Sequence, residues 1–238
     1  MNPNSIIDVE GLCHSYADGR ASLRDVSFAV SPGECVGLVG ANGAGKTTLF
    51  LLLAGILKPT SGAVRVVGLN PFASADRRQL PMKLGIVFQN SDDQIFHATV
   101  GDDVAFGPLN AGLCEEEVLV RVATSLRQVG LVGMENRSPL KLSEGEKRKV
   151  ALAGILAMQP EVILFDEPSV FLDARGRRSL VDTICGLVQT RLIASHDMEL
   201  IGNTCDRVLL MDEGRLITAG TIREILANRV LLEKHGVL

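Results

Sequence analysis

The sequence predicts one α/β domain over residues 1–238, with a mostly parallel core sheet, an N-terminal antiparallel β part and an inserted helical subdomain. The first observation behind this fold class is a set of short, continuous apolar runs. Such runs are typical of parallel strands that helices cover on both faces. They are Cys35–Val39, Leu84–Phe88, Val162–Phe165, Leu192–Ala194 and Val208–Met211. The second observation is that helical patterns alternate with these runs, as in strand–helix units.

The N-terminal part has a different β pattern. Residues 26–30 alternate apolar and polar side chains, as a half-buried strand does. Ile6–Val9 and Ala63–Val67 are two further short β-rich segments. We therefore expect the N-terminal part to be partly antiparallel.

The strand signal disappears between Asp92 and Leu142. Glu115 to Glu117 opens a segment whose apolar residues fall on one helical face; these residues are Val118, Val122, Leu126 and Val129. We interpret residues from about 92 to 159 as a helical subdomain. It is inserted into an α/β core that consists of residues 1–91 and 160–238.

Two capping-box patterns mark helix starts. Ser143 is followed by Glu146, and Thr221 by Glu224, which is the S/T-x-x-E spacing that satisfies the first N–H groups of a helix. We expect one helix to start at Ser143. The second box predicts a final helix, and its apolar residues would hold it against the body of the protein; they are Ile225, Leu226, Leu231 and Leu232.

The composition limits the classes of partner. A net charge of −4 and a pI near 5.6 give no general attraction to nucleic acid, so we expect no nucleic-acid partner. The two short basic clusters, Arg77-Arg78 and Lys147–Lys149, are expected to be solvated helix surface. The longest uncharged apolar run, Leu49–Leu57, is far shorter than the roughly twenty residues that cross a bilayer.

The compartment is predicted from the cysteines and the N-terminal residues. Five cysteines without a C-x-x-C pair indicate reduced thiols in the cytosol. Residues 1–5 lack the basic and then apolar organisation of a secretory signal. Because the longest apolar run is too short to cross a bilayer, any role at a membrane is expected to be that of a peripheral subunit.

Residues 40–47 read G-A-N-G-A-G-K-T, the G-x-x-x-x-G-K-T pattern of a phosphate-binding loop. Glycines let successive backbone N–H groups face a polyphosphate, and the helix start adds free donors and a positive dipole end. Lys46 is expected to contact the outer phosphates, and Thr47 a Mg²⁺ ion. A flexible glycine-rich turn is the alternative, and the strand before and helix after disfavour it. The expected binding residues are Gly40, Asn42, Gly43, Ala44, Gly45, Lys46, Thr47 and Thr48.

A buried strand ends in two carboxylates, Asp166 and Glu167. Ligands collect at the carboxyl ends of strands in open α/β sheets, so both acids should face the nucleotide. Asp166 is expected to hold Mg²⁺, and Glu167 to accept a proton from the attacking water. Without the phosphate loop, a solvated turn after the strand would be an equally good interpretation of this pair. The presence of the phosphate loop favours the catalytic interpretation.

Taken together, these motifs resemble those of the ATPase subunits of ABC transporters, over essentially the whole chain. Further motifs follow in the family's order: Gln89 in the Q-loop, Leu142–Glu146 in the signature loop, Val170–Asp173 in the D-loop and His196 as the switch histidine. Tyr16 falls where the family usually has an aromatic ring under adenine. The resemblance implies an ATPase with ATP and Mg²⁺ as cofactors.

The resemblance also implies roles for these residues. Gln89 would reach the metal or the attacking water, and His196 would hydrogen-bond the γ-phosphate. A second group would serve the nucleotide of a second ATPase subunit: Ser143, Gly145, Glu146 and Asp173. Taken alone, Gln89 is equally a turn residue, Tyr16 a surface aromatic, and His196 more often a core or capping residue.

The signature loop departs from the family's usual L-S-G-G-Q at two positions. Glu146 fits the capping box and occurs in one branch of the family. Glu144 replaces a glycine, and a carboxylate there would repel the γ-phosphate bound by the opposite subunit. We hypothesise that Glu144 points outward and that this second composite site still works.

Within the family, the chain looks most like the energy-coupling-factor and cobalt/nickel-uptake ATPases. The similar segments are Val87–Phe96, Thr99–Asn110 and Leu142–Pro160. This implies two ATPase subunits, as a homodimer or a heterodimer, that close on ATP at the cytoplasmic face of the cell membrane. They would drive a transmembrane coupling protein and a substrate-binding membrane subunit. Cobalt, nickel and vitamins remain open as substrates.

Phe96 and Phe106 are expected either to line the groove for the coupling protein or to pack in the core. The competing class for the whole chain is a soluble ABC-type ATPase in DNA repair, translation or cofactor assembly. The length excludes long coiled-coil insertions, and a single phosphate loop disfavours the fused translation proteins. Glu167 disfavours a third class, a regulatory module with little turnover.

Overall fold

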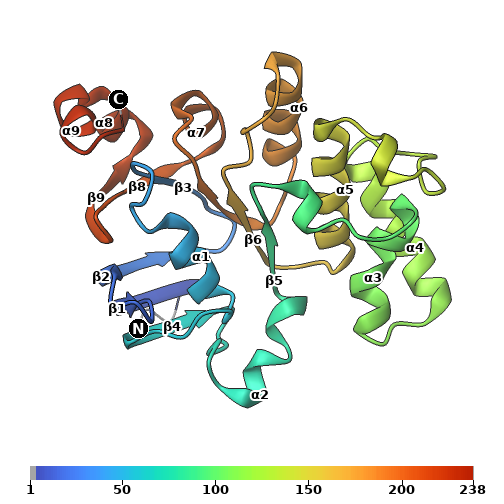
Figure 1. Cartoon of the computed structure of the whole chain (residues 1–238), viewed down its shortest axis with the longest axis horizontal. Helices are drawn as coiled ribbons and strands as arrows, with labels where there is room; N and C mark the ends of the chain where they lie inside the picture. Colours follow the sequence, from blue (N-terminus) through green and yellow to red (C-terminus); the bar gives the residue numbers. More distant parts are fainter. Residues whose placement is uncertain (1–3, 238) are drawn as a thin grey trace.

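The computed structural model describes residues 4–237, which form two sheets and the helices around them (Figure 1). The smaller sheet has three strands in the order β2-β1-β4, and the larger has six in the order β5-β6-β7-β3-β8-β9. Helix α1 (Lys46–Leu53) packs between the two sheets through Leu49, Phe50 and Leu53.

The smaller sheet consists of β1 (Ile7–Ser15), β2 (Ala21–Val30) and β4 (Ser61–Val66), and both neighbours run antiparallel to β1. The expected antiparallel N-terminal part is confirmed. Strand β1 is longer than the expected Ile6–Val9. Gly11, with a φ of 56°, lies at an irregularity in the pairing of β1 with β2. The strand then continues to Leu12, which is fully buried.

The larger sheet places the apolar runs side by side. Strands β3 (Cys35–Val39), β5 (Leu84–Val87), β6 (Val162–Asp166), β7 (Thr190–Ala194) and β8 (Arg207–Asp212) run parallel. Every residue of β3 and β6 is buried, as continuous apolar runs predict.

A ninth strand, β9 (Arg215–Thr221), pairs antiparallel with β8 at the edge of the larger sheet, and the sequence did not predict it. None of its residues is buried, and its sequence, R-L-I-T-A-G-T, does not alternate apolar and polar side chains. It depends on backbone pairing with β8, which a local pattern does not reveal.

Helices α3 (Val100–Asn110), α4 (Glu115–Gln128) and α5 (Glu144–Ala157) lie together on one side of the molecule (Figure 1). The described chain between β5 and β6 contains only these helices, loops and two short 3₁₀ turns, Ser91–Asp93 and Pro139–Lys141. The remaining helical segments are α2 (Ser74–Arg77), α6 (Ala174–Cys185), α7 (Met198–Thr204), α8 (Ile222–Ala227), α9 (Arg229–Lys234) and a 3₁₀ turn at Leu80–Met82.

Both capping boxes form. The Ser143 hydroxyl accepts from the N–H of Glu146, whose carboxylate accepts from the N–H of Ser143, and α5 begins at the next residue. Thr221 starts α8 in the same way. The expected single final helix is wrong, because Asn228 ends α8 and its side chain caps α9 by accepting from the N–H of Leu231.

The two faces of the larger sheet belong to two apolar clusters. Within β3, Val36 and Leu38 pack toward α1 and the smaller sheet, whereas Cys35 and Val39 pack on the side of the other helices. Helices or strands cover both faces of the larger sheet. The loops that follow β3 and β6 therefore start from fixed positions at the same edge of the sheet. Within residues 4–237, no helix is long and apolar enough to span a lipid bilayer.

Candidate nucleotide site

The loop between β3 and α1 curls around a cavity of about 260 Å³. Gly43 and Gly45 take φ values of 83° and 100°, a region that L side chains rarely adopt. A Cβ atom at Gly45 would lie 2.7 Å from the carbonyl oxygen of Ser22. The loop conformation therefore requires glycine here, as the phosphate-loop pattern predicts. The cavity is lined by Tyr16, Arg20–Ser22, Asn42–Thr48, Gln89, Asp166 and Glu167.

Lys46 is the first residue of α1, and its side chain is buried under the loop. Its ammonium donates to the carbonyl oxygens of Gly40 at 2.7 Å and Ala41 at 3.2 Å. The Nζ atom lies 3.5 Å from Oε1 of Glu167. A fixed positive charge thus borders the cavity, which suits an anionic ligand.

Asp166 ends strand β6 and is nearly fully buried. The hydroxyl of Thr47 donates to its Oδ2 at 2.7 Å, and its Oδ1 has no hydrogen-bond partner. Burial raises the pKa of Asp166, and the hydrogen bond from Thr47 partly opposes this rise. Buried oxygens from a carboxylate and a hydroxyl are ligands that Mg²⁺ prefers, so these residues fit that ion.

Glu167 follows β6 in an unusual backbone conformation with a φ of 47°. Its N–H donates to the carbonyl oxygen of Ala194, which ties this turn to the end of β7. Its Oε2 lies 2.8 Å from Nδ1 of His196 and accepts from the Ser195 hydroxyl at 3.3 Å. The carboxylate is therefore oriented by the two residues that follow β7, and its Oε1 accepts no hydrogen bond.

Tyr16 and Gln89 line the same cavity from outside the loop. The hydroxyl group of Tyr16 lies 2.9 Å from the hydroxyl oxygen of Thr48. The Arg20 guanidinium carbon lies 5.5 Å from the centre of the Tyr16 ring. Gln89 comes two residues after β5, beside β6 in the sheet. The structure thus brings together Asn42–Thr48 of the predicted phosphate loop, Tyr16, Gln89, Asp166 and Glu167, whereas Gly40 does not line the cavity and its carbonyl oxygen accepts from Lys46.

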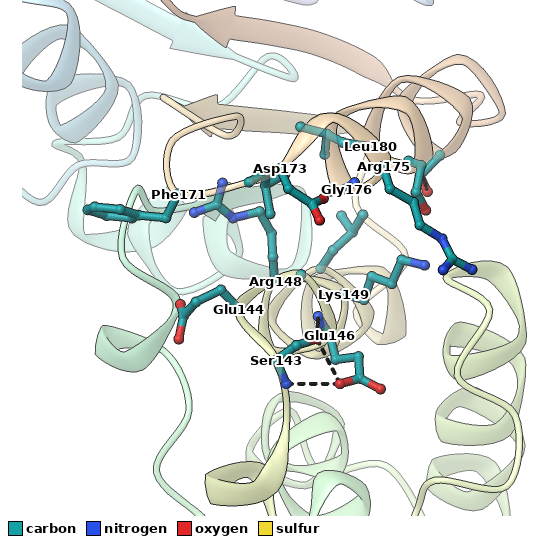
Figure 2. Close-up of a pocket in the computed structure, with 15 residues that line it drawn as sticks. Ser143, Glu144, Glu146, Arg148, Lys149, Phe171, Asp173, Arg175, Gly176 and Leu180 are labelled. Atoms are coloured by element: carbon teal, nitrogen blue, oxygen red, sulfur yellow. Dashed lines mark hydrogen bonds between the residues drawn. The ribbon is translucent and has the colours of Figure 1, made fainter.

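Ser143, Gly145, Glu146 and Asp173 line a different cavity, of about 620 Å³, between the starts of α5 and α6 (Figure 2). The Ser143 hydroxyl donates to Oε2 of Glu146 at 2.8 Å. Hydrogen bonds from the Ser143 N–H and hydroxyl lower the pKa of Glu146. Asp173 caps α6 by accepting from the N–H of Gly176 at 2.6 Å. Within this chain, these four residues do not reach the phosphate loop's cavity.

Glu144 leaves the start of α5 in the opposite direction from Glu146 (Figure 2). Its carboxylate pairs with Nζ of Lys147 at 3.1 Å, and the same Nζ pairs with Asp92 at 2.8 Å. The Glu144 side chain is about half exposed. Its charge therefore has a cationic partner on its own helix, but Glu144 also lines the cavity that contains Ser143 and Gly145, so the outward-pointing side chain stays a hypothesis.

Arg148 corrects the sequence-based prediction for the basic cluster of residues 147–149. It is 4% exposed rather than solvated. Its guanidinium donates to the carbonyl oxygens of Pro168, Val170 (3.0 Å) and Gln89 (2.6 Å). Sequence reasoning missed it because these acceptors are backbone groups from distant loops, and no local pattern marks them.

Comparison with known proteins identifies the relatives of this chain. Residues 23–170 match the family model described as ABC transporter. EcfA of Methanothermobacter thermautotrophicus, an energy-coupling factor transporter ATP-binding protein, is 46% identical over 98% of this chain and 76% of its own length. EcfA of Methanocaldococcus jannaschii is 44% identical over 98% of this chain and 85% of its own. The structure of cbiO1 from Clostridium perfringens, described as part of the ABC transporter complex cbiONQ, superposes with a TM-score of 0.86, at 36% identity, over 97% of this chain and 94% of that one.

We expect Lys46→Met to weaken ATP binding by about ten- to a hundredfold, because it removes a charged donor at the cavity. The measurement is titration of the purified protein with a fluorescent ATP analogue. Lys83→Met is the control, because Lys83 forms an exposed ion pair with Glu161 and does not line this cavity. Equal affinities of wild type and Lys46→Met would contradict the assignment of this cavity to ATP.

Proposed function

The chain belongs to the ABC transporter family, whose ATP-binding domain hydrolyses ATP, and on that premise we propose that it powers uptake through a membrane partner. We propose specifically the ATPase subunit of an energy-coupling-factor type importer. The observation that supports this branch of the family is the near full-length similarity to EcfA proteins and to cbiO1. The substrate class is a transition-metal ion, cobalt or nickel, or a vitamin.

The two separate cavities support a two-subunit site. One cavity holds the phosphate loop with Asp166 and Glu167, and the other the N-terminus of α5 with Ser143 and Gly145. A second ATPase subunit, identical or related, would bring its α5 N-terminus to the phosphates held by the first. Free N–H groups and the positive dipole end of a helix suit that contact. Asp173 and Glu146 border the same face.

The proposed chemistry follows from the positions of the side chains. N–H groups of residues 42–48 cradle the phosphates, and Lys46 adds its charge. Thr47 and Asp166 would hold Mg²⁺, which would neutralise phosphate charge when bound. Glu167 takes the proton of the attacking water through Oε1, which accepts no hydrogen bond and lies 3.5 Å from the Lys46 ammonium, and its Oε2 is fixed by Ser195 and His196.

Three further residues complete the proposed site. The His196 ring is 59% exposed, so it can also contact the γ-phosphate while its Nδ1 holds Glu167. Gln89 borders the same cavity and would orient the metal or the water. Tyr16 would stack on the adenine.

An exposed aromatic patch, defined as Phe96, His97 and Phe106, supports a protein partner near Gln89. Phe96 is 62% and Phe106 44% exposed, with ring centres 4.9 Å apart. The buried carboxylate of Asp103 accepts from the N–H groups of Phe96 and His97, at 3.0 and 2.9 Å. A rigid, exposed apolar patch is typical of an interaction site. We assign it to the transmembrane coupling protein, which associates with a substrate-binding subunit and keeps this chain at the cytoplasmic face of the membrane.

We expect Phe96→Ser and Phe106→Ser each to reduce co-purification of the chain with a hydrophobic membrane protein, without lowering ATP affinity, because these side chains are exposed. The measurement is affinity purification from detergent-solubilised membranes of the native host. Val188→Ser is the matched control, because Val188 is 86% exposed and lies outside the patch. A wild-type chain that stays in the soluble fraction without a membrane partner would favour a soluble ABC-type ATPase. Loss of ATP affinity with intact co-purification would contradict the assignment of this patch to the coupling protein.

We expect Glu144→Gly to change ATP turnover by less than about fivefold, because an exposed carboxylate paired with Lys147 contributes little. The measurement is steady-state ATP hydrolysis. Glu115→Gly is the control for the cost of glycine, because Glu115 is the first residue of α4 as Glu144 is of α5. A rise in turnover by orders of magnitude in Glu144→Gly would show that the native signature loop is degenerate.

A further inference from the structure

Arg148 is a buried cation that forms no ion pair among the described residues. It lies in the second turn of α5 and is 4% exposed. Removing a guanidinium from water is costly, so a buried arginine needs several acceptors in place of solvent. Here the acceptors are backbone carbonyl oxygens rather than a carboxylate. Burial lowers the pKa of Arg148, and the negative charge of Glu144 opposes that shift.

The carbonyl oxygens belong to two loops of the candidate nucleotide site. One is that of Gln89, which follows β5 and accepts from Nη2 at 2.6 Å. The others are those of Pro168 and Val170, which follow Glu167 and both accept from Nη1, the latter at 3.0 Å. The fork of one guanidinium therefore spans both loops, each branch serving one of them. A displacement of the side chain would release both loops together.

The neighbouring residue makes a second link between α5 and the segment after Gln89. The ammonium of Lys147 pairs with Asp92 at 2.8 Å and with Glu144 at 3.1 Å. Arg148 thus connects the start of α5 to Gln89, and Lys147 connects it to Asp92, three residues further along the same loop. Through these contacts, a movement of the α5 N-terminus would reach both loops.

We propose that Arg148 is a positioning residue that couples the signature end of α5 to the loops carrying Gln89 and Glu167. The coupling rests on the proposed function, in which the α5 N-terminus meets the nucleotide of a second subunit. Engagement of Ser143 and Gly145 would then fix Gln89 and Glu167 of the same chain through Arg148. This makes each of the two nucleotide sites responsive to the other.

The test compares Arg148→Met with Arg121→Met by hydrogen exchange and by ATP hydrolysis. Arg121 is a matched control, because it donates to the carbonyl oxygen of Ala157 and pairs with Glu117, away from both loops. In Arg148→Met, we expect amide exchange in residues 89–94 and 168–173 to rise together by at least about tenfold. Arg121→Met should leave exchange in both segments unchanged.

The kinetic readout separates positioning from general stability. We expect kcat for ATP to fall at least about tenfold in Arg148→Met, since misplaced catalytic groups cost that much or more. ATP affinity should stay at the wild-type value, because Arg148 does not line the phosphate loop's cavity. Unchanged exchange in either loop, or an unchanged kcat, would overturn the proposal.

If Arg148→Met does not fold, Arg148→Lys tests the positioning role instead. Lysine keeps the charge but has no planar fork, so it should leave at least one loop loosened and kcat reduced. Wild-type values for Arg148→Lys in both readouts would overturn the proposal, because charge alone would then suffice. If the wild type alone shows no turnover, the proposed site between two copies of this chain fails, and the exchange data alone decide the role of Arg148.

Discussion

The ammonium nitrogen of Lys46 and Oε1 of Glu167 lie 3.5 Å apart, and both side chains are largely buried. One comes from the start of α1 and the other from the end of β6, so their approach fixes the phosphate loop against the core sheet. The loop carbonyls, Thr47, Ser195 and His196 satisfy most of the remaining polar groups. Buried charges are tolerated only in such a network, and the site is therefore preorganised before any ligand binds.

The same constraint explains how the fold is arranged. Strand β6 lies between β5 and β7, with its residues fully buried, so its carboxyl end is a rigid platform for Asp166 and Glu167. The helical region between β5 and β6 contributes a different element, the α5 N-terminus in its own cavity. Arg148 is the side chain by which that region reaches the loops around the platform.

Local motifs in the sequence predicted the features that depend on local chemistry. The glycines of the phosphate loop, the capping box at Ser143 and the apolar run before Asp166 each act through neighbouring residues. Features that depend on distant partners were missed or wrong. Strand β9 depends on pairing with β8, and the break at Asn228 on a side chain that caps the next helix. The burial of Arg148 depends on carbonyl oxygens up to 59 residues away.

ATP hydrolysis by the wild type and by Glu167→Gln, combined with size-exclusion chromatography of each with and without Mg-ATP, tests the central claim most directly. We expect the wild type to hydrolyse ATP and Glu167→Gln to be nearly inactive, because the amide cannot take the proton of the attacking water. The variant should instead accumulate as an ATP-dependent dimer. Normal hydrolysis by Glu167→Gln would contradict the assignment of Glu167 as the base, and a variant that stays monomeric with ATP would contradict closure of two copies of this chain on the nucleotide.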